Sequence, residues 1–346
     1  MKIIKRDDLN NWLLSFEECY TVYAPVALDK NNRTLALINE KTDLSPGGQL
    51  PLGPIRLFFP ECEKLLKYKN GQSSGITKTF SKPLLIFGCS AADVKAIKFS
   101  DRFFNTDFVD PNYESRRQNA VTIVYSGYVN NGSSKNSANN SNSSNTEFEA
   151  LAFSDYDIQV VSLENNECLV KAGSDPGKEL IEKFNSKLTS ATPDTYNLWN
   201  ELEVKTREIP KEADIKKAAK LLAHDKVEDE FWDEIGKRCI SCGGCTYVCP
   251  TCTCFDVYDR GSKNEGVRLR CRDSCLLGGF TREASRHNPR GSDGKRTKRR
   301  IEHKLLYDPM RWDGETGCIE CGRCDNACPT GIGMYNVVKE MLKKYD

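Results

Sequence analysis

The sequence contains no long hydrophobic run and no excess of either charge. Its apolar stretches are short, as at residues 84–87, whereas a membrane span needs about 18 or more apolar residues. Direct membrane insertion is therefore not expected. The 50 lysines and arginines are balanced by 49 aspartates and glutamates, so nucleic-acid binding is not expected either. The first eight residues, MKIIKRDD, lack the apolar core of a signal peptide, which predicts a cytoplasmic protein.

Motifs for nucleotide binding and for a histidine metal site are also missing. There is no G-x-G-x-x-G loop, and residues 173–178, GSDPGK, are one residue short of a phosphate-binding loop. The three histidines are His224, His287 and His303, and their wide separation predicts no metal-binding triad. The residues left to carry chemistry are the cysteines.

Cysteine is abundant and unevenly distributed. Only four of the 16 cysteines precede residue 239, and the other twelve lie within residues 239–328. This region contains the pattern C-x2-C-x2-C-x3-C-P twice, ending at Pro250 and at Pro329. That spacing is typical of bacterial two-cluster ferredoxins, in which three close thiolates bind one 4Fe-4S cluster and the fourth cysteine ligates the other cluster.

The crossed pattern predicts two ligand sets. They are Cys239, Cys242, Cys245 and Cys328 for the first cluster, and Cys318, Cys321, Cys324 and Cys249 for the second. Structural zinc is disfavoured because zinc sites use paired C-x2-C units with four ligands in total, whereas each motif here has a third close cysteine and a proline. The sequence therefore predicts two 4Fe-4S clusters.

Four further cysteines lie in the long insertion between the two motifs. They are Cys252, Cys254, Cys271 and Cys275. Two interpretations stay open: these cysteines bind a third cluster, or they are free thiols packed as small apolar groups near the other two. Their C-x-C and C-x3-C spacings match no ligand pattern that decides between the two.

One stretch, residues 286–304, is strongly basic: RHNPRGSDGKRTKRRIEHK. A solvated loop is the simplest interpretation of such a run. The alternatives are docking to an acidic partner and offset of the negative charge of thiolate-bound clusters. No recognised nucleic-acid-binding fold accompanies the charge.

The part before the cysteine-rich region predicts an α/β domain. Short apolar runs bounded by Gly, Pro, Asn or Asp predict buried strands at residues 35–38, 55–59, 84–87 and 121–125. A helix is expected after the third of these, from Ala91 to about Phe103. Residues 130–145 form an Asn/Ser-rich tract that cannot offset the entropy of ordering, which predicts a disordered loop.

The predicted organisation has three parts. Residues 1–175 form an α/β scaffold and docking domain, and residues 176–237 a helical connector. Residues 238–346 form an expanded α+β ferredoxin-like module with two clusters and a long insertion.

Several stretches resemble a known family. They are CISCGGCTYVCPTCTCFDV, RLRCRDSCLLGGFTREASRHNPR, RRIEHKLLYDP, GCIECGRCDNACP, LLIFGCSAADVKAI and RRQNAVTIVY. Together they are similar to the iron-sulfur subunit of anaerobic sulfite reductase and to the related beta subunit of cytoplasmic sulfhydrogenases, over most of the chain. The resemblance implies a non-catalytic subunit that passes electrons from a flavoprotein subunit oxidising NAD(P)H to a catalytic subunit.

The family leaves a choice of complex. A sirohaem sulfite reductase is the expected catalytic partner, and a NiFe hydrogenase is the alternative. A rival of another class is a self-sufficient enzyme with a catalytic cluster, for instance at Cys252, Cys254 and Cys275. Relatives often carry a cysteine at the place of Ala92, and a Cys-x-Cys motif where this chain has its Asn/Ser tract, so the N-terminal domain is expected to hold no cluster.

Overall fold

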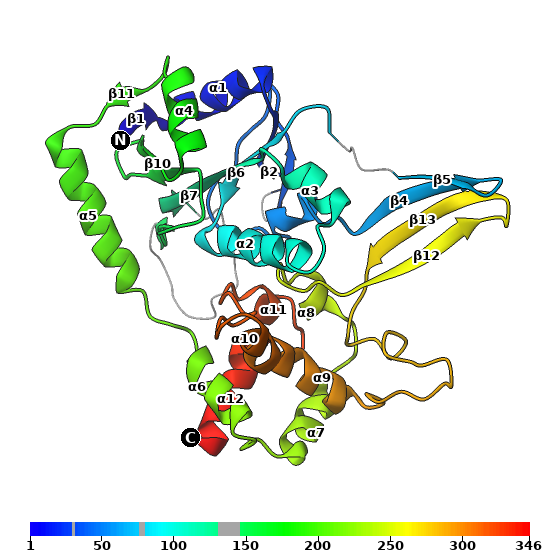
Figure 1. Ribbon diagram of the computed structural model, residues 1–346. Helices are drawn as coiled ribbons and strands as arrows, with labels where there is room; N and C mark the ends of the chain where they lie inside the picture. Colours follow the sequence, from blue (N-terminus) through cyan, green and yellow to red (C-terminus); the bar gives the residue numbers. More distant parts are fainter. Residues whose placement is uncertain (30–31, 76–79, 131–145) are drawn as a thin grey trace. The chain divides into compact units, whose positions relative to one another are not determined.

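The apolar runs of the N-terminal part form a mixed β-sheet in a computed structural model of the chain (Figure 1), which describes residues 1–29, 32–75, 80–130 and 146–346. The centre of the sheet consists of four strands: β2 (Thr21–Ala27), β6 (Leu84–Cys89), β7 (Val121–Asn130) and β9 (Ile158–Ser162). Neighbours in this series run parallel. The residues of β9 are all buried, as expected of a parallel strand covered on both faces.

Further strands extend this sheet on both sides. Its order is β11-β1-β10-β9-β7-β6-β2-β3, with β8 paired to β7. Their bounds are β1 Lys2–Lys5, β3 Arg33–Leu37, β8 Thr146–Glu149, β10 Glu167–Ala172 and β11 Thr189–Ser190. The predicted loop over residues 130–145 lies, apart from residue 130, outside the described residues.

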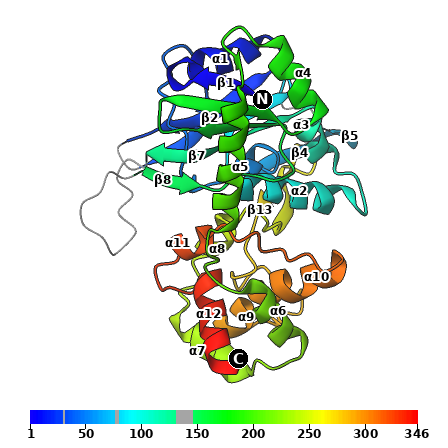
Figure 2. The ribbon, with the colours of Figure 1, turned by 90° about the vertical axis from the view of Figure 1, so that its left-hand side faces the viewer.

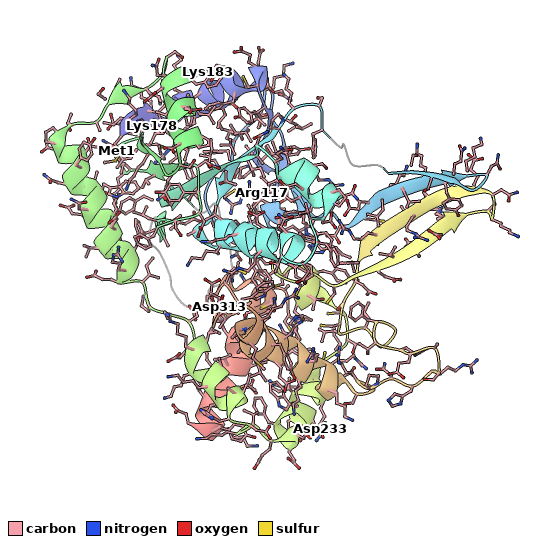
Figure 3. The ribbon with its side chains drawn as sticks, viewed as in Figure 1. Met1, Arg117, Lys178, Lys183, Asp233 and Asp313 are labelled. Carbon is pink, nitrogen blue, oxygen red and sulfur yellow. A yellow bond between two sulfur atoms is a disulfide. The ribbon has the colours of Figure 1, made fainter. Side chains whose placement is uncertain are left out.

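The unit that contains this sheet also contains α-helices. They are α1 (Leu9–Ser15), α2 (Ala91–Asn105), α3 (Pro111–Arg117), α4 (Asp175–Lys183) and α5 (Pro193–Arg207). Helix α2 begins where predicted because the Ser90 side chain accepts a hydrogen bond from the Asp93 N–H while the Asp93 carboxylate accepts one from the Ser90 N–H. Arg117, labelled in Figure 3, ties α3 to α2 by donating from Nε to both carboxylate oxygens of Asp101 at 2.9 and 3.1 Å.

One predicted strand is wrong. Residues 55–59 overlap a 3-10 helix, Pro54–Leu57, and the chain continues without a strand to Phe59. Pro54 fixes φ and has no N–H to give to a sheet, so it favours a helical first turn. The apolar residues of this run are buried nevertheless, Ile55 and Phe58 among them.

The chain divides into two compact units. The first is Met1–Phe59 with Thr77–Ile209, and the second is Pro60–Ile76 with Pro210–Asp346. Helices α4 and α5, which the sequence placed in a connector, belong to the first unit, and the connector's remaining helices belong to the second. Among the described residues, no helix is long and apolar enough to cross a membrane.

The second unit contains a four-stranded antiparallel sheet in the order β12-β13-β4-β5. The strands are β4 (Cys62–Lys69), β5 (Gln72–Gly75), β12 (Phe255–Gly261) and β13 (Glu265–Arg272). The pairing of β4 with β13 joins parts of the chain about two hundred residues apart. Arg270 and Glu63 form a salt bridge across this pair, Nη2 to Oε1 2.6 Å, with side chains only 5% and 3% exposed.

Helices of the second unit gather around one core (Figures 1 and 2). They are α6 (Ile215–Ala223), α7 (Asp229–Arg238), α8 (Gly244–Tyr247), α9 (Asp293–Glu302), the π-helical segment η4 (His303–Tyr307), α10 (Asp308–Arg311), α11 (Arg323–Asn326) and α12 (Met334–Tyr345). Apolar side chains of α6, α7, α9, η4 and α12 form the core, and four motif cysteines pack against it: Cys239, Cys318, Cys324 and Cys328.

Helix α7, which leads into the first motif, lies very close to α9. A Cβ on Gly236 would come within 2.4 Å of the Gly294 nitrogen, so only glycine fits at this contact. Asp233, labelled in Figure 3, lies on α7 one turn before it. The contact fixes the start of the first motif relative to the helix that carries the basic run.

Candidate metal centre

The two cysteine motifs fold into the same local structure. Gly243 and Gly322, the residues that follow the second cysteine of each motif, have φ 71° with ψ −5° and −6°. Ser241 and Glu320, two positions earlier, also have positive φ, 52° and 58°. Because glycine adopts the left-handed region without steric cost, each loop can turn back tightly and place the third cysteine on a short helix, α8 or α11.

The second motif and the last cysteine of the first motif line one cavity. Its wall includes Cys249, Cys318, Cys321 and Cys324, together with Cys245 and Cys252. The Thr251 hydroxyl donates to the Gly317 carbonyl at 2.6 Å, which joins the segment after Cys249 to the segment before Cys318. The structure thus brings together the four cysteines that the crossed pattern assigned to the second cluster.

The cysteines of the first set are also neighbours. Burial raises the pKa of Cys245, and the thiolate charges of Cys328 and Cys239 raise it further against the lowering effect of Arg300. A Cβ on Gly244 would lie 3.5 Å from Cys242 Sγ and 3.9 Å from the carbonyl oxygen of Ala327, the residue before Cys328. The end of the second motif therefore lies beside the loop of the first motif. Cys242 is the exposed cysteine of the first set.

Hydrogen-bond donors surround the cysteine sulfurs. Backbone N–H groups point at three of them: Ser241 at Cys239 (3.4 Å), Met334 at Cys324 (3.3 Å) and Ile332 at Cys328 (3.4 Å). Burial alone would raise the pKa of Cys328, but hydrogen bonds from Thr330 and Ile332 lower it below its ordinary value. Such donors stabilise the thiolate, the form that binds iron.

Two cations of the basic run are buried in the same cavity wall. Arg300 and Lys304 are 3% and 6% exposed. Lys304 Nζ donates to the Thr251 carbonyl (3.2 Å), the Thr251 hydroxyl (2.7 Å) and the Gly317 carbonyl (3.4 Å). Arg300 Nη2 donates to the Ile332 carbonyl at 2.8 Å, while its buried Nε has no hydrogen-bond partner among the described residues.

This donor set fits 4Fe-4S clusters. A cluster with four thiolate ligands carries net negative charge, which buried cations compensate. Thiolates are also the ligands that such clusters require. Within the described ranges, no three His, Cys, Asp or Glu side chains are placed to hold a single metal ion; the cysteines surround a cavity instead.

The four additional cysteines are not brought together as one set. Cys271 on β13 is disulfide-bonded to Cys62 on β4, a cysteine for which the sequence predicted no role. Cys252 contacts Cys249, and a hydrogen bond from Cys252 lowers the pKa of Cys249 well below its ordinary value. Cys254 and Cys275 also contact each other. A hydrogen bond from Cys275 lowers the pKa of Cys254 to about 7.

The first unit contains Cys19, Cys89 and Cys168, which lie outside the two motifs. Cys89 ends β6 just before α2, is 1% exposed, and its thiol donates to the Ile86 carbonyl at 3.7 Å. Ala92 lies in the first turn of α2. These positions place a buried thiol at the end of β6 in the first unit.

Comparison with known proteins agrees with the metal centre. Residues 238–332 match the family model described as a 4Fe-4S dicluster domain. The chain is 29% identical over 329 residues to sulfhydrogenase 2 subunit beta of Pyrococcus furiosus, which covers 94% of this chain and 93% of that relative. No solved structure matches significantly. The resemblance inferred from the sequence is therefore confirmed: residues 238–332 match a 4Fe-4S dicluster domain, which indicates two 4Fe-4S clusters, and the chain is similar over 94% of its length to a sulfhydrogenase beta subunit.

Proposed function

We propose that this chain is the beta-type subunit of a sulfhydrogenase-like complex and relays single electrons between a flavoprotein subunit that oxidises NAD(P)H and a NiFe catalytic subunit. The observation that carries the relay is the cavity in which Cys249 of the first motif joins Cys318, Cys321 and Cys324 of the second. The relative with 94% coverage is a sulfhydrogenase subunit. This similarity favours the sulfhydrogenase alternative over the sulfite reductase that we expected first.

The proposed ligands are the two crossed sets. Cys239, Cys242, Cys245 and Cys328 hold the first cluster, and Cys249, Cys318, Cys321 and Cys324 the second. When bound, each cluster takes up and gives back one electron. The chain's own residues orient the thiolates through N–H donors, exclude water with the core of α6, α7, α9 and α12, and compensate charge with buried cations.

The sharpest test of the ligand sets is Cys249→Ser, with Cys252→Ser as its matched control. Both side chains line the same cavity and contact each other, but only Cys249 belongs to a motif. The unmodified full chain, purified anaerobically, should contain about eight irons, and about four more would show that Cys252, Cys254 and Cys275 also bind metal. Cys249→Ser should lose or alter the cluster of the second motif alone, as seen by electron paramagnetic resonance, and Cys252→Ser should retain both.

The relay itself is tested in the assembled complex. Because a serial relay fails when one link is broken, Cys249→Ser should abolish NAD(P)H-driven turnover while the flavoprotein subunit still reduces an artificial dye. The chain alone should show no turnover, which separates a relay from a self-sufficient enzyme. Loss of the first motif's cluster in Cys249→Ser would contradict the crossed assignment, and surviving turnover would contradict the relay.

A further inference from the structure

The helix formed by α9 and η4 lies in the insertion between the two motifs and carries two buried cations. Arg300 and Lys304 are four positions apart, so their side chains lie on one helix face. Lys304 belongs to the π-helical segment His303–Tyr307, a local widening of the kind that often marks a functional position. Both side chains line the cavity that contains Cys249 and Cys318.

Lys304 connects the two segments that bring ligands from opposite motifs. Its ammonium has three N–H donors, and it has three acceptors: two oxygens of Thr251 and the carbonyl of Gly317. Thr251 comes two residues after Cys249, and Gly317 directly precedes Cys318. The Lys304 charge therefore lies where the cross-ligated cysteine meets the second motif.

Arg300 has a different place. Burial raises the pKa of Cys245, which belongs to the first set, and of Cys324, which belongs to the second, and the Arg300 charge opposes both shifts. It also donates to the carbonyl of Ile332, whose N–H donates to Cys328. Arg300 thus acts on both cysteine sets, whereas the thiolates that act most strongly on Lys304 are Cys249 and Cys252.

The two motifs are not equivalent in this respect. Arg238 precedes the first cysteine of the first motif, as Gly317 precedes that of the second. The Arg238 guanidinium is paired with Glu340 at 2.7 Å, and both side chains are about 40% exposed. The second motif thus has a buried lysine at its entrance, where the first has a screened surface pair.

A buried cation favours the reduced form of a neighbouring cluster. Reduction adds one negative charge, and a fixed positive charge in a region of low dielectric stabilises that charge more than it stabilises the oxidised form. Asp308 opposes this effect, since its carboxylate is also buried and acts on Lys304. The sign of each side chain therefore predicts the direction in which its removal moves the cluster potential.

We propose that Lys304 is a charge-compensating positioning residue that keeps the cluster of Cys249, Cys318, Cys321 and Cys324 at a less negative potential than the cluster of the first motif. This asymmetry makes the second cluster the electron-accepting member of the pair. The inference rests on the proposed ligand sets and adds the direction of the equilibrium between the clusters.

The test is a redox titration of the full chain followed by electron paramagnetic resonance, at about pH 8 so that Asp308 is ionised. Lys304→Met keeps the length of the side chain and removes its charge, and Lys304→Arg retains the charge. Lys304→Met should shift the second cluster to a more negative potential with a smaller shift of the first, and Lys304→Arg should restore most of the original value. Iron analysis verifies that each variant retains both clusters.

Asp308→Asn tests the same proposal by removing a negative charge while Lys304 stays unchanged, so the expected shift in potential has the opposite sign. It should shift the second cluster to a less negative potential, so the proposal stays testable even where Lys304→Met does not assemble. Equal shifts of both clusters, or no shift in either variant, would overturn it. These titrations need no partner subunit, so they separate this inference from the proposed function. If the potentials of the variants do not shift while the assembled complex still turns over with NAD(P)H, only this inference fails. If the potentials shift but the unmodified chain supports no such turnover, the proposed function fails.

Discussion

The left-handed glycines of the two motif loops predict a graded loss of cluster retention. In Gly322→Ala the new Cβ would sit at φ 71° and 3.3 Å from Tyr335 Cε2. An L-residue in the left-handed region costs about 1–2 kcal/mol. In Gly243→Ala the same φ is combined with tighter contacts, 3.0 Å to Tyr247 Cε2 and 3.2 Å to Ser274 Oγ, so its cost should be larger.

That strain should be released when the loop opens to give up iron. A change of about 1–2 kcal/mol corresponds to a factor of about 5–30 in rate. Anaerobic protein mixed with an iron chelator, followed by loss of visible absorbance, should therefore lose iron about 5–30 times faster in Gly322→Ala and faster still in Gly243→Ala. Electron paramagnetic resonance should show loss from the second cluster in the former and the first cluster in the latter.

Gly279→Ala is the matched control, because Gly279 has an ordinary φ and no atom within 4 Å of an added Cβ. It should release iron at the rate of the unmodified protein. If Gly322→Ala and Gly279→Ala release iron equally slowly, the left-handed turn does not limit cluster retention, and the reasoning fails.

Two further predictions concern buried charges of the second unit. Arg270→Leu removes the buried salt bridge to Glu63 and should lower the free energy of unfolding by about 3–5 kcal/mol. In urea denaturation, the double variant with Glu63→Leu should show a smaller loss of free energy of unfolding than Arg270→Leu alone. An equal loss would contradict the role of the buried charge. Burial raises the pKa of Asp308 to about 6, so the folded state binds this proton more tightly than the unfolded state. The associated stability is complete below the ordinary carboxyl pKa and is lost as pH rises through about 6, so the unmodified protein should be more stable at about pH 5 than at about pH 7.5 by about 1 kcal/mol. Asp308→Asn should lack this part of the pH dependence, and an unchanged pH profile of the thermal midpoint would contradict the assignment.

The features that the sequence predicted well are those encoded over short distances. Three thiolates within seven residues can bind three corners of one cluster, and a glycine after the second cysteine permits the turn, so both motifs could be recognised in the sequence. Strand β6 and helix α2 were likewise readable, because an apolar run is followed directly by the Ser90 cap.

The features it missed depend on pairing across the chain. Strand β4 contains exposed, partly buried and buried residues without a strict alternation and carries no strong local signal. It forms because it pairs with β13, and the partner of Cys271 is Cys62, 209 residues away. No local pattern could choose that partner over the other cysteines of the insertion, so the sequence left open whether the four additional cysteines bind a third cluster or are free thiols.

The basic run shows the same division within one segment. Its composition left open a solvated loop, a docking surface and an offset of cluster charge. The structure leaves Arg286 and His287 exposed but buries Arg300 and Lys304 beside the cysteines. The sequence by itself determined where cysteines with the spacing of cluster ligands lie, because that spacing is local. Only the tertiary structure decided which cations face the cysteines, because the helical face that turns inward is set by packing of α9 against α7 and the core, and not by the order of charges along the chain.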